Sequence, residues 1–150
     1  MAKFVYRLQN ILNLKLKLED QAKNEYAIIK KMYDDTLELK TLEEEKLHLE
    51  EAHLKMLMSK RLDFSQIRIS RNGIERLKEN VEKINRQLEE IRKRLNYASK
   101  KMSEAMIERK THEKLKENAF GIFIKDTLSA ENKETDELVS FKYNNSSEDV

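Results

Sequence analysis

Apolar residues recur at alternating steps of three and four along the second half of the chain. Eleven of the twelve positions in this row are apolar, and Ser70 is the exception. A sustained seven-residue repeat presents one narrow stripe to a partner helix and predicts a left-handed coiled coil. The row comprises Ile67, Ser70, Ile74, Leu77, Val81, Ile84, Leu88, Ile91, Leu95, Ala98, Met102 and Ala105.

The first half repeats the pattern less regularly, which predicts a helix whose register changes through a stutter between about 40 and 55. Two phases fit the later part, and the residues do not decide between them. The earlier row is Phe4, Leu8, Ile11, Lys15, Leu18, Ala22, Glu25, Ile29, Met32, Thr36 and Leu39. The later row runs either through Leu42, Leu49 and Met56 or through Leu47, Leu54 and Leu57.

A connection between the two rows is expected at about 59–63. Asp63 precedes Phe64-Ser65-Gln66, so that an acid stands at the N-cap and a glutamine at the third helical position, as in a capping box. Asn72-Gly73 is the competing break, but it lies inside the repeat and is interpreted as a weak point within a helix. The predicted fold is all-α: one antiparallel two-helix coiled-coil hairpin over residues 1–141.

Composition supports long helices. The 150 residues include no Pro, no Cys and only two Gly, while 39% are charged. A chain that avoids both strong helix breakers has few internal stop signals. The expected elements are helix 1 over about 3–58, helix 2 over about 64–141 and a disordered tail over 142–150. Because helix 2 is longer, its end is expected to overhang and to leave Phe120 to Ile124 without an opposing helix.

Charge is distributed unevenly although the net charge is only +2. Residues 64–116 carry 15 basic and 8 acidic side chains, and Ile91 to Ser103 contains five bases and no acid. Nucleic-acid binding is one interpretation, but only Tyr97 interleaves as a stacking group. A surface that steers an acidic protein partner is the favoured interpretation, and no nucleic acid is expected.

Candidate chemistry is sparse, and an enzyme is not expected. His48 and His53 lie five residues apart and do not share a helix face, so they do not resemble a zinc site. His112 continues the second row and is expected to have a structural role. No glycine-rich phosphate loop is present, and no cofactor or metal is expected. The N-terminus lacks the features of a secretory signal, although its acid-free start leaves a basic amphipathic helix or transit peptide open.

Three stretches resemble the FliJ family of flagellar type III export proteins. The opening Phe4 to Leu12 is similar to the start of the family's first helix. Phe64 to Ile67, with the apolar steps to Ile74, resembles the family's second helix after the turn. Glu131 to Leu138 is similar to the closing stretch, in which an acid pair precedes an apolar residue.

The resemblance implies a cytoplasmic, non-enzymatic component of flagellum biogenesis and motility, held at the inner face of the cell membrane through its partners. Those partners are the export ATPase hexamer, which a stalk-like chain enters and stimulates, the export gate membrane protein and the substrate chaperones. A free monomer is expected. A related injectisome system would suit the same features.

Two surfaces follow from combining the hairpin with the resemblance. The tip facing the gate or chaperones would comprise Phe64, Ile67, Arg71 and Ile74. The ATPase ring would meet Phe4, Leu8, Ile11, Phe120, Ile122, Phe123, Ile124 and Leu138. Two alternatives remain: a structural coiled coil that dimerises in parallel through the second row, and a basic arm that binds nucleic acid.

Overall fold

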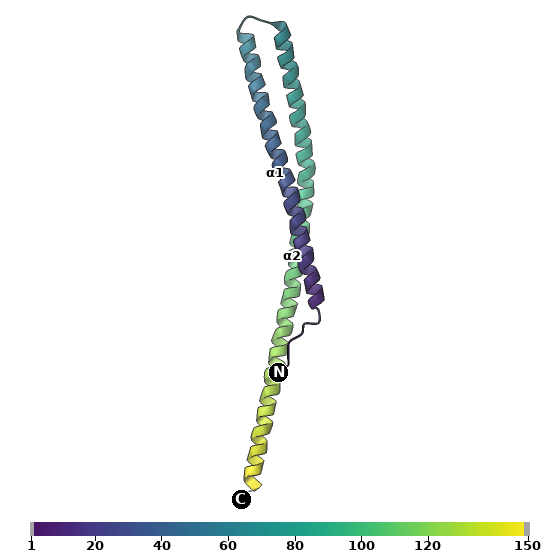
Figure 1. Cartoon of the computed structure of the whole chain (residues 1–150), viewed down its shortest axis with the longest axis vertical. Coiled ribbons are helices and arrows are strands. Elements are labelled where there is room, and N and C mark those ends of the chain that lie inside the picture. Colours follow the sequence, from purple (N-terminus) through teal and green to yellow (C-terminus); the bar gives the residue numbers. More distant parts are fainter. Residues whose placement is uncertain (1, 149–150) are drawn as a thin grey trace. The chain divides into compact units, whose positions relative to one another are not determined.

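The computed structural model describes residues 2–148 and contains two helices in that range, α1 (Gln9–Ser59) and α2 (Phe64–Glu148). The helices pack against each other as an antiparallel helical hairpin, and residues 60–63 connect them (Figure 1). The predicted fold class is therefore confirmed. Internal contacts divide the described residues into two compact units: unit 1 comprises residues 2–19 and 104–148, and unit 2 comprises residues 20–103.

The connection forms where the capping residue predicts it. The Asp63 carboxylate accepts hydrogen bonds from the backbone N–H groups of Ser65 at 3.1 Å and Gln66 at 3.5 Å. These donors have no partner inside the first helical turn, so the aspartate satisfies them and starts α2. Gly73 lies within α2 without a positive φ, so the Asn72-Gly73 pair does not interrupt the helix.

Both ends of the chain differ from the expected element bounds. Residues 2–8 are not helical, so α1 begins at Gln9 and not near residue 3. At the other end, the expected tail from 142 is helical as far as Glu148, while residues 149 and 150 lie outside the described part. No Gly or Pro stands in 142–148 to end the helix.

In unit 2, the face that α2 turns toward α1 matches the predicted row. Five of its residues are buried: Ile67, Ser70, Ile74, Leu88 and Ala98. The others in this unit are half-buried: Leu77, Val81, Ile84, Ile91, Leu95 and Met102. In unit 1, the same steps of three and four continue through Ala105, Arg109, His112, Lys116, Ala119, Phe123 and Thr127.

The inward face of α1 shares every second member of the predicted row, such as Lys15, Ala22 and Ile29, and replaces the members between them by the next residue. Leu12 and Glu19 are buried, whereas the expected Ile11 and Leu18 are exposed. The observed row keeps steps of three and four without interruption, so the expected stutter between 40 and 55 is absent. In unit 1 it comprises Leu12, Lys15 and Glu19. In unit 2 it comprises Ala22, Tyr26, Ile29, Tyr33, Thr36, Lys40, Glu43, Leu47, Glu50, Leu54 and Leu57.

Polar pairing with α2 explains this choice of face. Glu19 turns inward because Arg109 donates two hydrogen bonds to its carboxylate, from Nε at 2.5 Å and Nη2 at 3.2 Å. In unit 2, Ser70 Oγ donates to Glu50 Oε1 at 2.8 Å. A buried polar group is tolerated when it is hydrogen-bonded, so partners on the facing helix can override an apolar pattern.

Candidate functional site: two exposed surfaces

The first surface lies in unit 1, where the N-terminal segment packs on α2. The Phe4 ring lies 5.1 Å from the Phe120 ring and 5.4 Å from the Phe123 ring, measured between centroids. Phe120 and Phe123 stand one helical turn apart and stack at 6.5 Å. Aromatic pairs at these separations stabilise a contact beyond the area they bury. The three rings therefore fix the non-helical segment against the helix.

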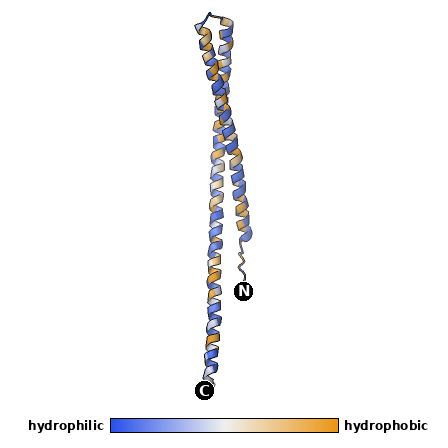
Figure 2. Cartoon of the chain, turned by 60° about the vertical axis from the view of Figure 1, so that its left-hand side comes forward, coloured by the Kyte–Doolittle hydropathy of each residue, from blue (hydrophilic) through white to orange (hydrophobic). Residues whose placement is uncertain are grey.

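Apolar side chains remain exposed around this aromatic cluster. A groove of about 900 Å³ runs beside the N-terminal segment, with Phe4, Leu8, Ile122 and Phe123 among its lining residues. Farther along α2, every residue from 128 to 147 is exposed, including large apolar ones. Figure 2 shows hydrophobic residues, in orange, along the α2 ribbon toward the C-terminus, separated by hydrophilic ones in blue. The exposed set comprises Phe120, Ile122, Ile124, Leu128, Leu138, Val139 and Phe141.

The expected ring-facing residues therefore fall into two groups. Phe4 and Phe123 are half-buried against each other. The remaining six are exposed: Leu8, Ile11, Phe120, Ile122, Ile124 and Leu138. Apolar surface of this extent without a covering element marks an interaction site more often than it marks an ordinary surface.

Two ion pairs join α1 to α2 next to this surface. Lys15 Nζ lies 2.5 Å from Glu108 Oε2, and this hydrogen bond is the main cause that lowers the pKa of Glu108. Arg109 donates hydrogen bonds to Glu19 and to Glu113, and both raise the pKa of the arginine. The bond to Glu19 has the larger effect. Both shifts favour the charged forms of Glu108 and Arg109, which are the forms that make these ion pairs.

Two buried polar atoms in unit 1 lack a hydrogen-bond partner, the Tyr6 hydroxyl and His112 Nδ1. Tyr6 belongs to the N-terminal segment, and His112 occupies the inward row of α2 at the position expected from the sequence. Burying such atoms without partners costs free energy. The buried polar groups around Tyr6 and His112 therefore have fewer hydrogen bonds than those around Glu19.

The second surface lies in unit 2 at the turn. Phe64 and Ile69 are 77% and 69% exposed, and Arg71 is exposed between the inward positions. Ile67 and Ile74, which were expected beside them, are buried against α1, and a partner contact through these two residues stays a prediction. Both residues follow the spacing of the inward row. Ile69 directly precedes Ser70 of that row and does not share its spacing, so the repeat gives no signal for this exposed residue.

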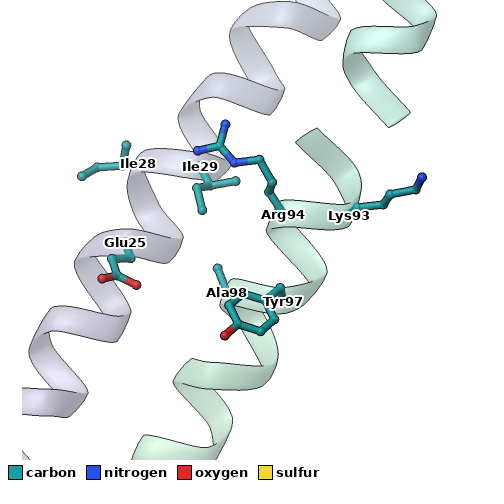
Figure 3. A pocket seen from close by; sticks show the side chains of 7 residues that line it. All are labelled: Glu25, Ile28, Ile29, Lys93, Arg94, Tyr97 and Ala98. Carbon is teal, nitrogen blue, oxygen red and sulfur yellow. The ribbon is translucent and has the colours of Figure 1, made fainter. Parts of the chain in front are cut away.

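The basic run of α2 lies beside an apolar groove of about 550 Å³ in unit 2. Figure 3 shows Arg94 reaching from α2 toward Ile29 of α1, with Tyr97 and Ala98 below it. Lys101 Nζ lies 5.6 Å above the Tyr97 ring, so the base and the aromatic residue already contact each other. His48 and His53 are exposed, and no group of three metal-binding side chains gathers among residues 2–148.

These features define a class of protein: a two-helix hairpin with exposed apolar and charged surfaces and little buried core. Its sequence matches the profile of the family described as flagellar FliJ protein over residues 4–148. The chain belongs to this family, and it is therefore a component of flagellar protein export. The family is non-catalytic.

No curated protein and no solved structure matches the chain. Within residues 2–148, neither helix contains a stretch long and apolar enough to cross a membrane.

Proposed function

We propose that the chain acts as a stalk-like partner of the flagellar export ATPase and binds its ring through the exposed apolar surface of unit 1. The observation that supports this most directly is the run of uncovered apolar residues from Phe120 to Phe141 on a helix that has no facing helix there. An isolated solvated helix needs no such residues, whereas a helix that docks on a partner does.

The aromatic cluster gives this surface a fixed shape. Phe4 holds the N-terminal segment beside Ile122 and Phe123, so that residues from both ends of the sequence line one groove. A surface already ordered before binding loses less conformational entropy when a partner covers it. Phe4 therefore contributes by positioning the segment, and the exposed Phe120, Ile122 and Leu138 supply the contact.

Purified export ATPase provides the test through its rate of ATP hydrolysis with and without the chain. The informative variant is Ile122→Asp/Leu138→Asp, because both side chains are more than 60% exposed and neither belongs to the inward row. We expect it to abolish stimulation while helicity by circular dichroism stays unchanged. Ile107→Asp is the matched control, since Ile107 is 64% exposed in the same unit but precedes the apolar run. Full stimulation by the double variant would contradict the proposal.

The same proposal assigns the export gate and substrate chaperones to the turn of unit 2. Phe64 and Ile69 supply exposed apolar contacts there, and Arg71 supplies a charge for an acidic partner. Pull-down of gate and chaperone proteins with Phe64→Ala/Arg71→Glu tests this assignment separately from ATPase stimulation. Loss of both partners is the expected result, and undiminished recovery of both would remove the turn from the proposal.

A further inference from the structure

A second apolar row runs along α1 in unit 2, apart from the row that faces α2. Its six apolar members are 40 to 72% exposed. They follow each other in steps of three, four or seven, which is the spacing of a coiled-coil seam. The row comprises Ile28, Met32, Leu39, Leu42, Leu49 and Met56.

This row lies on a different side of α1 from α2. Each member stands one residue before an inward position, as Ile28 stands before Ile29, and one residue corresponds to about 100° around a helix. Figure 3 shows Ile29 directed toward α2 and Ile28 directed away from it. Helix α2 therefore cannot cover the second row, and a third helix can pack on it without displacing α2.

We propose that a second copy of this chain covers the row, with the two α1 helices packed antiparallel. The seam spacing includes two charged positions among the apolar ones, Asp35 and Lys46. A two-fold axis between residues 40 and 41 places each Asp35 opposite Lys46 of the second copy. The same axis sets Leu39 opposite Leu42 and Met32 opposite Leu49, so the central layers match in apolar character and charge. The outer members Ile28 and Met56 face His53 and Glu25 of the second copy.

This self-complementarity selects the second copy and its direction. In a parallel pair, Asp35 would face Asp35 and Lys46 would face Lys46, which places like charges in the seam. If the antiparallel pair is shifted by one heptad, Asp35 no longer faces Lys46. A shift in one direction places Lys46 opposite Leu42 of the second copy, and a shift in the other direction places it opposite Ile28. An isologous interface requires this type of two-fold match on a single patch, whereas a foreign helix does not.

Two glutamates at the edge of the proposed interface repel each other and so weaken association. Glu38 and Glu45 stand directly before Leu39 and Lys46, so the two-fold axis brings Glu38 of one copy near Glu45 of the other. These side chains are exposed, and salt screens their repulsion. The proposed dimer is therefore weak at low ionic strength. At high protein concentration, the proposed dimer replaces the free monomer expected from the sequence.

Sedimentation equilibrium of the full chain measures the association directly. Lys46→Asp puts acid opposite Asp35, and we expect the dissociation constant to rise about ten-fold or more. The exchange Asp35→Lys/Lys46→Asp restores opposite charges in the antiparallel pair and should recover the dimer. Glu38→Gln/Glu45→Gln should strengthen it. A chain that stays monomeric at all accessible concentrations, or a double exchange no better than Lys46→Asp, would overturn the inference.

Cysteine cross-linking tests the orientation cleanly because the chain contains no cysteine. An equimolar mixture of Met32→Cys and Leu49→Cys should form the mixed disulfide, and Met32→Cys alone should not. Strong self-linking of Met32→Cys would indicate a parallel pair and contradict the proposal. Leu37→Asp is the matched control, since Leu37 is 42% exposed on α1 but lies outside the row. It should leave association unchanged, whereas Leu39→Asp should abolish it at equal helicity.

Discussion

Replacing Gly73 by alanine isolates the contribution of one backbone position, because the structure leaves room for the added methyl group. A Cβ built on Gly73 would lie 3.9 Å from Glu50 Cγ, which is ordinary van der Waals contact. The residue is helical and has no positive φ, so alanine adopts the same conformation without strain. Alanine exceeds glycine in helix propensity by about 1 kcal/mol, partly because it restricts the unfolded chain.

The expected gain for Gly73→Ala is therefore about 0.5 to 1 kcal/mol in free energy of unfolding. A change of this size corresponds to a rise of about 1 to 4 °C in the melting temperature for a chain of this length. Thermal and urea unfolding followed by circular dichroism at 222 nm measure it. Gly121→Ala is the matched control, since nothing lies within 4 Å of its added Cβ and α2 contains both glycines.

The comparison of the two variants can refute the reasoning. If Gly121→Ala stabilises the protein but Gly73→Ala destabilises it, the methyl group must collide with a neighbour, and the placement of Glu50 beside Gly73 would be wrong. If both variants are equally stabilising, the helix propensity accounts for the effect and Glu50 tolerates the contact. A neutral result at both positions would mean that the helix is not formed there.

Two further predictions address packing and pH. Leu88→Ala, at a buried inward position, should cost about 2 kcal/mol in urea unfolding, near the low end for such changes because only one helix faces it. The control Leu37→Ala, at an exposed position outside both rows of α1, should cost little. The Lys15–Glu108 pair should stabilise unit 1 above pH 4.5, the ordinary pKa of Glu108, and lose that contribution as pH falls through the lowered value. Glu108→Gln should flatten this acid dependence of the unfolding midpoint, and an unchanged pH profile would contradict it.

The repeat in the second half of the chain was sufficient to predict the inward face of α2. Its apolar residues recur from Ile67 to Met102 with few apolar competitors one residue away, so only one stripe can face a partner. Asp63 likewise predicted the start of α2, because capping is a local interaction between a side chain and the next backbone N–H groups. Local features of this kind are readable without knowledge of the neighbouring helix.

The ends of the elements depended on contacts that the pattern does not contain. Phe4 fits the helical spacing of the first half, yet it lies in a non-helical segment because its ring packs on Phe120 and Phe123 of α2. Beyond residue 141, Ser146 and Ser147 donate hydrogen bonds to backbone carbonyl groups one turn earlier. The polar composition there suggested a tail, but it does not prevent helix formation.

The sequence by itself determined that this chain forms two long helices joined near residue 61, because it lacks helix breakers and repeats apolar residues at helical spacing. It also carried the family resemblance. It did not determine which side of α1 faces inward, since two rows one residue apart are both apolar in part. Only the tertiary structure decided this: Glu19 and Glu50 find hydrogen-bond donors on α2 at Arg109 and Ser70, and so the competing row remains exposed.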